Sequence, residues 1–142
     1  MSFLNTLPLH IGKTTFIISE FTALDRLRDL EYDIELPKKP APEANASDED
    51  KAAYNFHIEE RGLDQVSHSL ALSLFHSHPG DDKDMHEYAR ILELQGIVKA
   101  KWPNRKVHEA YELLKKLNNP NFEPDEESEP QDPQDPPTPE KS

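Results

Sequence analysis

The chain has 142 residues and no cysteine, and its 28 acidic against 16 basic side chains give a formal net charge of −12. That length supports one domain with a single hydrophobic core, and the lack of cysteine excludes disulfides, thiolate nucleophiles and cysteine-based zinc sites. The negative charge repels phosphate backbones and anionic membrane surfaces, which argues against binding to nucleic acid or to a membrane. The first residues lack a basic leader and no window has the apolar length of a membrane span, so we expect a cytosolic protein.

Residues 7–18 alternate between apolar and polar side chains on either side of Gly12-Lys13. This pattern predicts a β-hairpin, because glycine accepts the positive φ of a tight turn. An isolated hairpin is only marginally stable in water, so its apolar side must pack on another element. We expect that element to be the helix that follows.

Four segments show the apolar periodicity of α-helices, and prolines or polar stretches separate them. They span about residues 19–36, 52–78, 84–99 and 104–117. The predicted apolar stripes are Ala23, Leu27, Leu30 and Ile34; Leu63, Val66, Leu70 and Leu74; Met85, Tyr88, Ala89 and Leu92; and Val107, Ala110, Tyr111, Leu114 and Leu117. The second helix has a further apolar strip with Leu72 and Phe75, which is typical of a helix at the centre of a bundle or shared with a partner.

These elements predict a mainly α (α+β) fold, in which an N-terminal β-hairpin packs on a three- to four-helix bundle. We expect a helical domain at residues 1–118, with residues 37–51 as an exposed linker because they contain no bulky apolar side chain. Residues 119–142 hold seven of the 13 prolines, and their eight carboxylates and one lysine supply −7 of the net −12. Proline density and charge repulsion predict a disordered, acidic, Pro-rich C-terminal tail.

The stretch "LFHSHPG" at residues 74–80 contains the His-Ser-His-Pro run that supplies two zinc ligands in JAMM-type metalloproteases. In those enzymes an Asp ligand follows, whereas here Ala89 stands in that region, and the run ends a predicted helix rather than a strand. We interpret His76 and His78 as helix-end residues, where cations interact favourably with the helix dipole. Without GxSxG, P-loop, GxGxxG or HExxH motifs, the sequence predicts no enzyme, catalytic residue, metal ligand or cofactor.

The helices carry more apolar surface than a chain of this size needs, which favours a protein that binds the helices of other chains. The candidate partner-binding residues are Leu72, Phe75, Trp102 and Tyr111. Alternatively, every stripe is simply core, or the apolar faces support a homo-oligomer. A different alternative function is a small acidic protein-protein adaptor or inhibitor that acts through its C-terminal tail.

Three segments occur in the order typical of one family. They are "GKTTFIISEFTALDRLRDLEY" (12–32), "LALSLFHSH" (70–78) and "KAKWPNRKVHEAYELLKKLN" (99–118), the last with Trp102-Pro103 at a helix break. Together they resemble the minor tail protein G family, the tail assembly chaperones of lambda-like phages. The resemblance covers about residues 10–118 and places the first segment in the family's opening hairpin and helix.

This resemblance implies a non-catalytic phage tail assembly chaperone that binds the tape measure protein and helps to recruit tail tube subunits. It also implies a location in the host cytoplasm and absence from the mature virion. Family members are often made in two lengths by a −1 ribosomal frameshift, so contact with the major tail protein is expected through a longer form. The acidic tail is expected to oppose aggregation of such complexes.

Overall fold

The computed structural model describes residues 3–124, which form one antiparallel β-hairpin and four α-helices. Strands β1 (Thr6–Ile11) and β2 (Thr14–Ser19) pair from Thr6 opposite Ser19 to Ile11 opposite Thr14. Gly12 has a φ of 59° in the turn between them, a left-handed conformation that residues with a Cβ rarely adopt. The predicted hairpin and its turn are confirmed.

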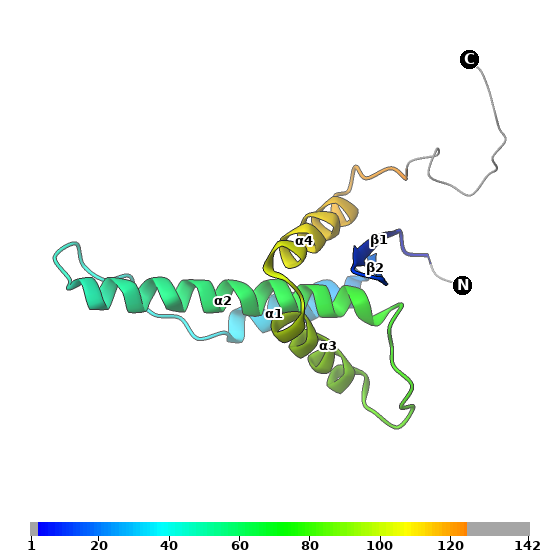
Figure 1. Ribbon diagram of the computed structural model, residues 1–142, viewed down its shortest axis with the longest axis horizontal. Coiled ribbons are helices and arrows are strands. Elements are labelled where there is room, and N and C mark those ends of the chain that lie inside the picture. Colours follow the sequence, from blue (N-terminus) through cyan, green and yellow to red (C-terminus); the bar gives the residue numbers. More distant parts are fainter. Residues whose placement is uncertain (1–2, 125–142) are drawn as a thin grey trace, which may run out of the picture.

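The helices are α1 (Ala23–Glu35), α2 (Asp48–Phe75), α3 (Glu87–Lys101) and α4 (Asn104–Asn118). Helix α2 has 28 residues and forms the long axis of the molecule (Figure 1). At a rise of about 1.5 Å per residue it is about 42 Å long. Helices α3 and α4 cross its C-terminal half and the hairpin lies near its C-terminal end, while its N-terminal half extends beyond them. Within residues 3–124, no helix has the length and apolarity that a bilayer span requires.

Capping residues explain where the first two helices begin. The Thr22 hydroxyl accepts a hydrogen bond from the Asp25 amide at 3.0 Å, and the Thr22 amide donates to the Asp25 carboxylate at 2.9 Å. This capping box starts α1 after the end of β2, later than predicted. Ser47 caps α2 by accepting from the Asp50 amide at 3.1 Å, so three acidic residues of its first turn extend the helix toward the N-terminus.

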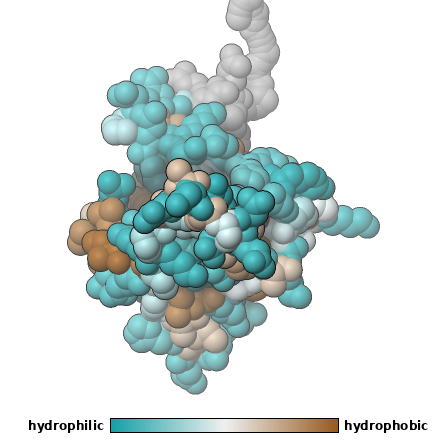
Figure 2. Space-filling model, turned by 90° about the vertical axis from the view of Figure 1, so that its left-hand side faces the viewer, coloured by the Kyte–Doolittle hydropathy of each residue, from teal (hydrophilic) through white to brown (hydrophobic). Residues whose placement is uncertain are grey.

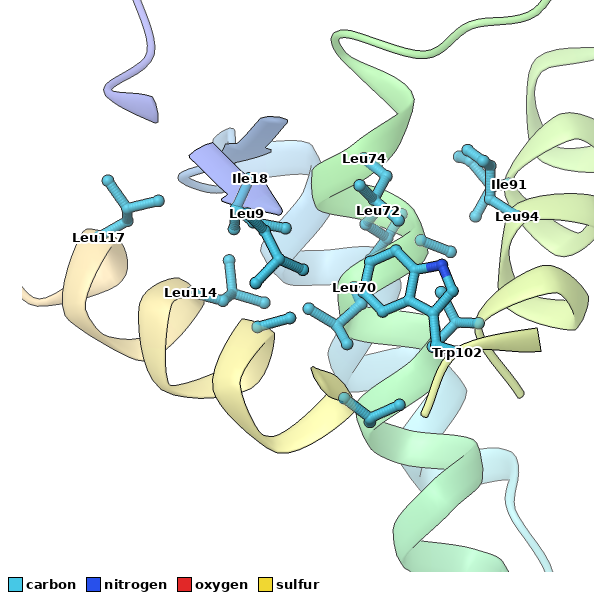
Figure 3. Close-up of a cluster of buried hydrophobic side chains, with 14 residues drawn as sticks. Leu9, Ile18, Leu70, Leu72, Leu74, Ile91, Leu94, Trp102, Leu114 and Leu117 are labelled. Carbon is cyan, nitrogen blue, oxygen red and sulfur yellow. The ribbon is translucent and has the colours of Figure 1, made fainter. Parts of the chain in front are cut away.

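The hydrophobic core lies where the hairpin, α3 and α4 meet the C-terminal half of α2 (Figure 3). Leu70, Ala71, Leu72 and Leu74 are all buried, so this part of α2 is covered on every side. The prediction of a central helix is therefore confirmed. The other buried apolar residues are Leu9, Ile18, Ile91, Leu94, Val98, Trp102, Val107, Ala110, Leu114 and Leu117.

Two packing predictions are wrong. The hairpin rests on α2 and α4 rather than on α1, and its Leu9 and Ile18 join the common core. Helix α3 buries Ile91, Leu94 and Val98, whereas the predicted stripe is not its core face. The members of that stripe, Met85, Tyr88, Ala89 and Leu92, are partly or fully exposed, with Leu92 at 45%. Aliphatic side chains three and four apart give α3 a second, more apolar stripe, and α2 covers that one.

The chain beyond α4 starts by returning to the core. Phe122 is half-buried and packs against the core cluster. Most of the segment predicted as a disordered tail, from 125 to 142, lies outside the described residues. The division of the chain at residue 118 stays a prediction.

Candidate partner-binding surface

Helix α1 contacts α2 through an acidic face rather than an apolar one. Asp25, Asp29 and Asp33 are four residues apart and therefore share one side of the helix. Each carboxylate accepts hydrogen bonds from residues of α2 or from His76, which directly follows α2. The two helices run antiparallel, so aspartates later in α1 contact residues earlier in α2. The partners are His76 for Asp25, His68 and Ser69 for Asp29, and Arg61 and Gln65 for Asp33.

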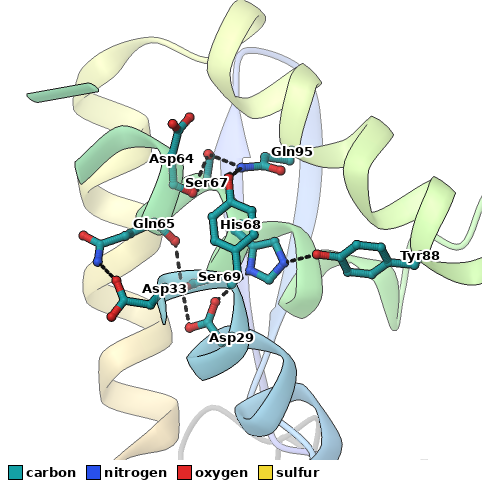
Figure 4. Close-up of polar contacts among 10 residues, drawn as sticks. Asp29, Asp33, Asp64, Gln65, Ser67, His68, Ser69, Tyr88 and Gln95 are labelled. Carbon is teal, nitrogen blue, oxygen red and sulfur yellow. Dashed lines mark hydrogen bonds and ion pairs between the residues drawn. The ribbon is translucent and has the colours of Figure 1, made fainter. Parts of the chain in front are cut away.

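The centre of this contact is a buried hydrogen-bond network around His68 (Figure 4). The Nδ1 of His68 lies 2.8 Å from Asp29 Oδ1, and its Nε2 lies 2.7 Å from the hydroxyl of Tyr88 on α3. The Tyr32 ring stacks on the imidazole at 3.9 Å between centroids, and the Ser69 hydroxyl donates to Asp29 Oδ2 at 2.7 Å. Burial raises the pKa of Tyr88 above its ordinary value, so its hydroxyl remains protonated at neutral pH. The network links α1, α2 and α3.

Because its polar face is turned inward, α1 presents its large apolar side chains to solvent. Leu24, Leu27, Leu30 and Ile34 are 52%, 64%, 46% and 72% exposed, and we call them the α1 stripe. Figure 2 shows apolar surface (brown) gathered at the left of the view. This is the side of the molecule where α1 lies behind α2 in Figure 1. The predicted periodicity of α1 is thus present, but its apolar face points away from the core. An exposed apolar stripe of this kind is typical of a protein interaction site.

A groove lies beside the α1 stripe, between α1 and α4, and we call it the α1–α4 groove. Its middle has a volume of about 270 Å³ and is lined by Leu30 of α1, Gly62 and Val66 of α2, and Tyr111 of α4. A further hollow of about 400 Å³, which also includes Tyr111 in its lining, continues the groove toward the end of α4. Leu30 belongs to both the stripe and the groove, so the two features form one continuous surface.

The two histidines of the His-Ser-His-Pro run contact different elements. Helix α2 ends at Phe75, and His76 Nε2 then lies 2.7 Å from Asp25 at the start of α1. His78 Nε2 accepts a hydrogen bond from the Ile17 amide of β2 at 3.1 Å. Burial, with the nearby Arg90 cation, lowers the pKa of His78 and keeps this nitrogen unprotonated. Among residues 3–124, no group of three or more His, Asp or Glu side chains is arranged to hold a metal ion.

The structure divides the four predicted partner-binding residues into two pairs. Leu72 is fully buried and Trp102 is 8% exposed, so both are core side chains in this conformation. Phe75 and Tyr111 are half-buried, and Tyr111 lines the α1–α4 groove. Partner contact by these residues stays a prediction, and the half-buried pair is accessible for it.

The acidic face of α1 and the glycine of the groove were not predicted as functional features. Asp25, Asp29 and Asp33 have a spacing of four opposite the leucines, which marks a second regular face of the helix. On α2, the polar residues Gln65, Ser67, His68 and Ser69 interrupt the apolar pattern where α1 and α3 pack. These two patterns together are the part of the sequence that indicates a polar helix contact.

Comparison with known proteins identifies the family. Neither a curated protein nor a solved structure gives a significant match to the chain. The family model described as bacteriophage lambda tail assembly chaperone, TAC, protein G, matches residues 2–136. This match spans the hairpin, all four helices and part of the acidic segment, and the chain therefore belongs to the lambda tail assembly chaperone family.

Proposed function

We propose that this tail assembly chaperone binds the tape measure protein of its phage through the α1 stripe. The observation that carries the proposal is the orientation of α1, whose four large apolar side chains are 46–72% exposed. A tape measure protein is expected to expose long apolar helical surfaces before the tail tube encloses it. An apolar helix stripe can cover such a surface by helix-on-helix packing.

The inward contacts of α1 support this orientation as a fixed feature. Asp25 is 7% exposed at its side chain and pairs with His76, and the buried His68 pairs with Asp29. Rotating α1 to bury the leucines would expose these aspartates to solvent and leave His68 buried without its carboxylate partner, which is unfavourable. The stripe is therefore available to a partner without rearrangement of the helix.

We further propose that the chaperone acts without catalysis, helps to recruit tail tube subunits, and leaves before the virion is complete. In this proposal contact with the major tail protein uses a longer form made by ribosomal frameshifting, and assembly takes place in the host cytoplasm. The family assignment supports a role in tail assembly. Reading the codons near the end of the gene for a slippery sequence tests the longer form.

Co-expression with the tape measure protein of the same phage tests the binding proposal. The double variant Leu27→Glu/Ile34→Glu places two charges in the stripe and is expected to abolish co-purification of the tape measure protein. Leu92→Glu on α3 is the matched control, because Leu92 is 45% exposed and lies outside the stripe. Equal capture by the double variant, the control and the wild-type protein would contradict the role of α1.

The alternative function, an acidic adaptor that acts through its tail, predicts a different result in the same assay. Deletion of residues 125–142 removes most of the acidic segment while leaving the described fold intact. Under our proposal the shortened chain still captures the tape measure protein, although the complex becomes less soluble. Loss of capture on this deletion, with capture retained by the double variant, would favour the adaptor.

A further inference from the structure

We propose that the α1–α4 groove is an anchor pocket that receives one large apolar side chain from a helix bound along the α1 stripe. This inference rests on the proposed function, since the helix would belong to the tape measure protein. The stripe supplies a surface to lie on, and the groove beside it supplies a position that fixes the register. Helix-in-groove complexes commonly use such anchor residues at helical spacing.

The pocket is open because α2 has a glycine at its floor. Gly62 lies in the middle of a 28-residue helix, where glycine is less favourable than alanine by about 1 kcal/mol. A Cβ built at Gly62 meets no heavy atom within 4 Å, so no tight packing contact requires glycine there. The missing side chain instead leaves space among the groove residues Leu30, Val66 and Tyr111.

The polar groups in the pocket wall already have partners. Asp29 accepts hydrogen bonds from His68 and Ser69, and Asp33 accepts from Arg61 and Gln65. An apolar side chain that enters the groove therefore leaves none of these carboxylates without a hydrogen bond. It gains contact with Leu30, Val66 and the Tyr111 ring, which lie on three different helices.

Charges on the two edges of the site indicate the chemistry and orientation of the bound helix. At one end of the groove stand Arg26 and Lys115; Lys115 is paired with Glu112 at 2.8 Å, whereas within residues 3–124 the Arg26 guanidinium makes no hydrogen bond or ion pair. Glu31 and Glu35 line a hollow on the other edge of α1, together with Arg28, whose guanidinium is paired with Glu87 at 2.8 Å. A complementary helix therefore carries acidic residues on its α4-facing edge and basic residues on the opposite edge. A second copy of this chain fits less well, because its net charge of −12 opposes self-association.

A large side chain introduced at Gly62 of α2 fills the pocket and tests the inference directly. In Gly62→Leu the new side chain occupies the groove floor, and binding is expected to weaken at least about tenfold. Gly96→Leu is the matched control, because Gly96 is also in a helix and its Cβ position also meets nothing within 4 Å, but it does not line the groove. Gly62→Ala checks the fold and is expected to bind like the wild-type protein, since a methyl group leaves most of the pocket open.

The probe is a set of overlapping synthetic peptides of about 30 residues that span the tape measure protein of the same phage, with affinities measured by fluorescence anisotropy. The expected result is one tight-binding peptide whose affinity falls for Gly62→Leu and not for Gly96→Leu. Within that peptide, replacing one large apolar residue by alanine in the wild-type complex is expected to reproduce the same loss. Arg26→Glu is expected to weaken binding several-fold through the charged edge.

The possible failures are distinguishable. If the wild-type protein binds a peptide and Gly62→Leu binds it equally well, the anchor pocket is overturned while the proposed function stands. If Gly62→Leu and Gly96→Leu lose affinity to the same extent, the loss is a general effect of the substitution and the pocket is again overturned. If no peptide and no intact tape measure protein binds the wild-type chain, the proposed function fails and the inference fails with it.

Discussion

Helices α1 and α4 are of similar length and both pack on α2, but α4 contacts the core with its apolar face and α1 contacts α2 with its polar face. Helix α4 buries Val107, Ala110, Leu114 and Leu117 in the core. Helix α1 turns its aspartates inward and leaves its leucines in solvent. An apolar stripe at helical spacing therefore tells which residues share a face, while the direction of that face depends on what the neighbouring helix offers.

The two helices are held by different kinds of interaction. Burial of a leucine side chain stabilises a fold by about 1.5–3 kcal/mol, and α4 buries two leucines, one valine and one alanine. A typical hydrogen bond contributes only about 0.5–1.5 kcal/mol net, and α1 depends mainly on such bonds. We therefore expect α4 to be an integral part of the core and α1 to be attached more weakly.

The largest expected difference between the two helices appears when one leucine on each is replaced by alanine. Leu114→Ala on α4 is expected to lower the free energy of unfolding by about 2–5 kcal/mol, because Leu114 is 1% exposed and the change leaves a cavity. Leu27→Ala on α1 is expected to change it by less than about 0.5 kcal/mol, because its side chain is 64% exposed. Urea unfolding followed by circular dichroism measures both. Similar losses in the two variants would show that the leucines of α1 are buried in solution.

The second prediction concerns the polar contact of α1. Asp29→Ala removes the carboxylate that accepts from His68 Nδ1 and leaves a fully buried imidazole without that partner. The expected loss of unfolding free energy is about 1–3 kcal/mol. Glu31→Ala, two residues away on the exposed side of α1, is the control and is expected to be nearly neutral. Two equally neutral variants would argue against the aspartate face as the attachment of α1.

The elements of the fold follow from local patterns. The hairpin is indicated by alternation around Gly12, and the central place of α2 by apolar residues on both of its sides, Leu70 and Leu72 among them. Four of the five residues of the predicted α4 stripe are buried, with Tyr111 at its edge. These features are predictable because each depends on residues close together in the sequence.

The orientation of α1 and the core face of α3 depend on distant residues. Asp29 pairs with His68, 39 positions away, and Asp25 with His76, 51 positions away. Those partners lie outside residues 19–36, so the pattern of that segment alone could not show which face of α1 turns inward. Helix α3 carries two overlapping stripes, and contact with α2 selects the one with Ile91 rather than the one with Leu92.

Amide hydrogen exchange gives a third, smaller contrast between the two helices. Local opening of α1 breaks polar contacts and exposes little apolar surface, whereas opening of α4 exposes part of the core. Amides in the middle of α1 are expected to exchange at least about tenfold faster than those of α4, which corresponds to about 1.4 kcal/mol of opening free energy. Mass spectrometry of peptides from residues 23–35 and 104–118 measures the difference. Equal protection would show that α1 opens only with the whole domain.

The smallest expected effect is a pH dependence of the stability that arises where the hairpin is attached. His76 contacts α1 through Asp25, whereas His78 Nε2 accepts the Ile17 amide hydrogen of the hairpin. The pKa of His78 is lowered from its ordinary value of 6.5 in the folded protein, chiefly by burial and then by Arg90. The unfolded chain therefore binds the His78 proton more readily, so the stability from this residue is present above about pH 6.5 and is lost as the pH falls below it. His78→Gln cannot titrate, so its urea midpoint is expected to fall less than that of the wild-type protein between pH 7.5 and 5.5. If the urea midpoints of the variant and of the wild-type protein fall equally between pH 7.5 and 5.5, the pH dependence comes from other groups. The hairpin would then be insensitive to the charge of His78.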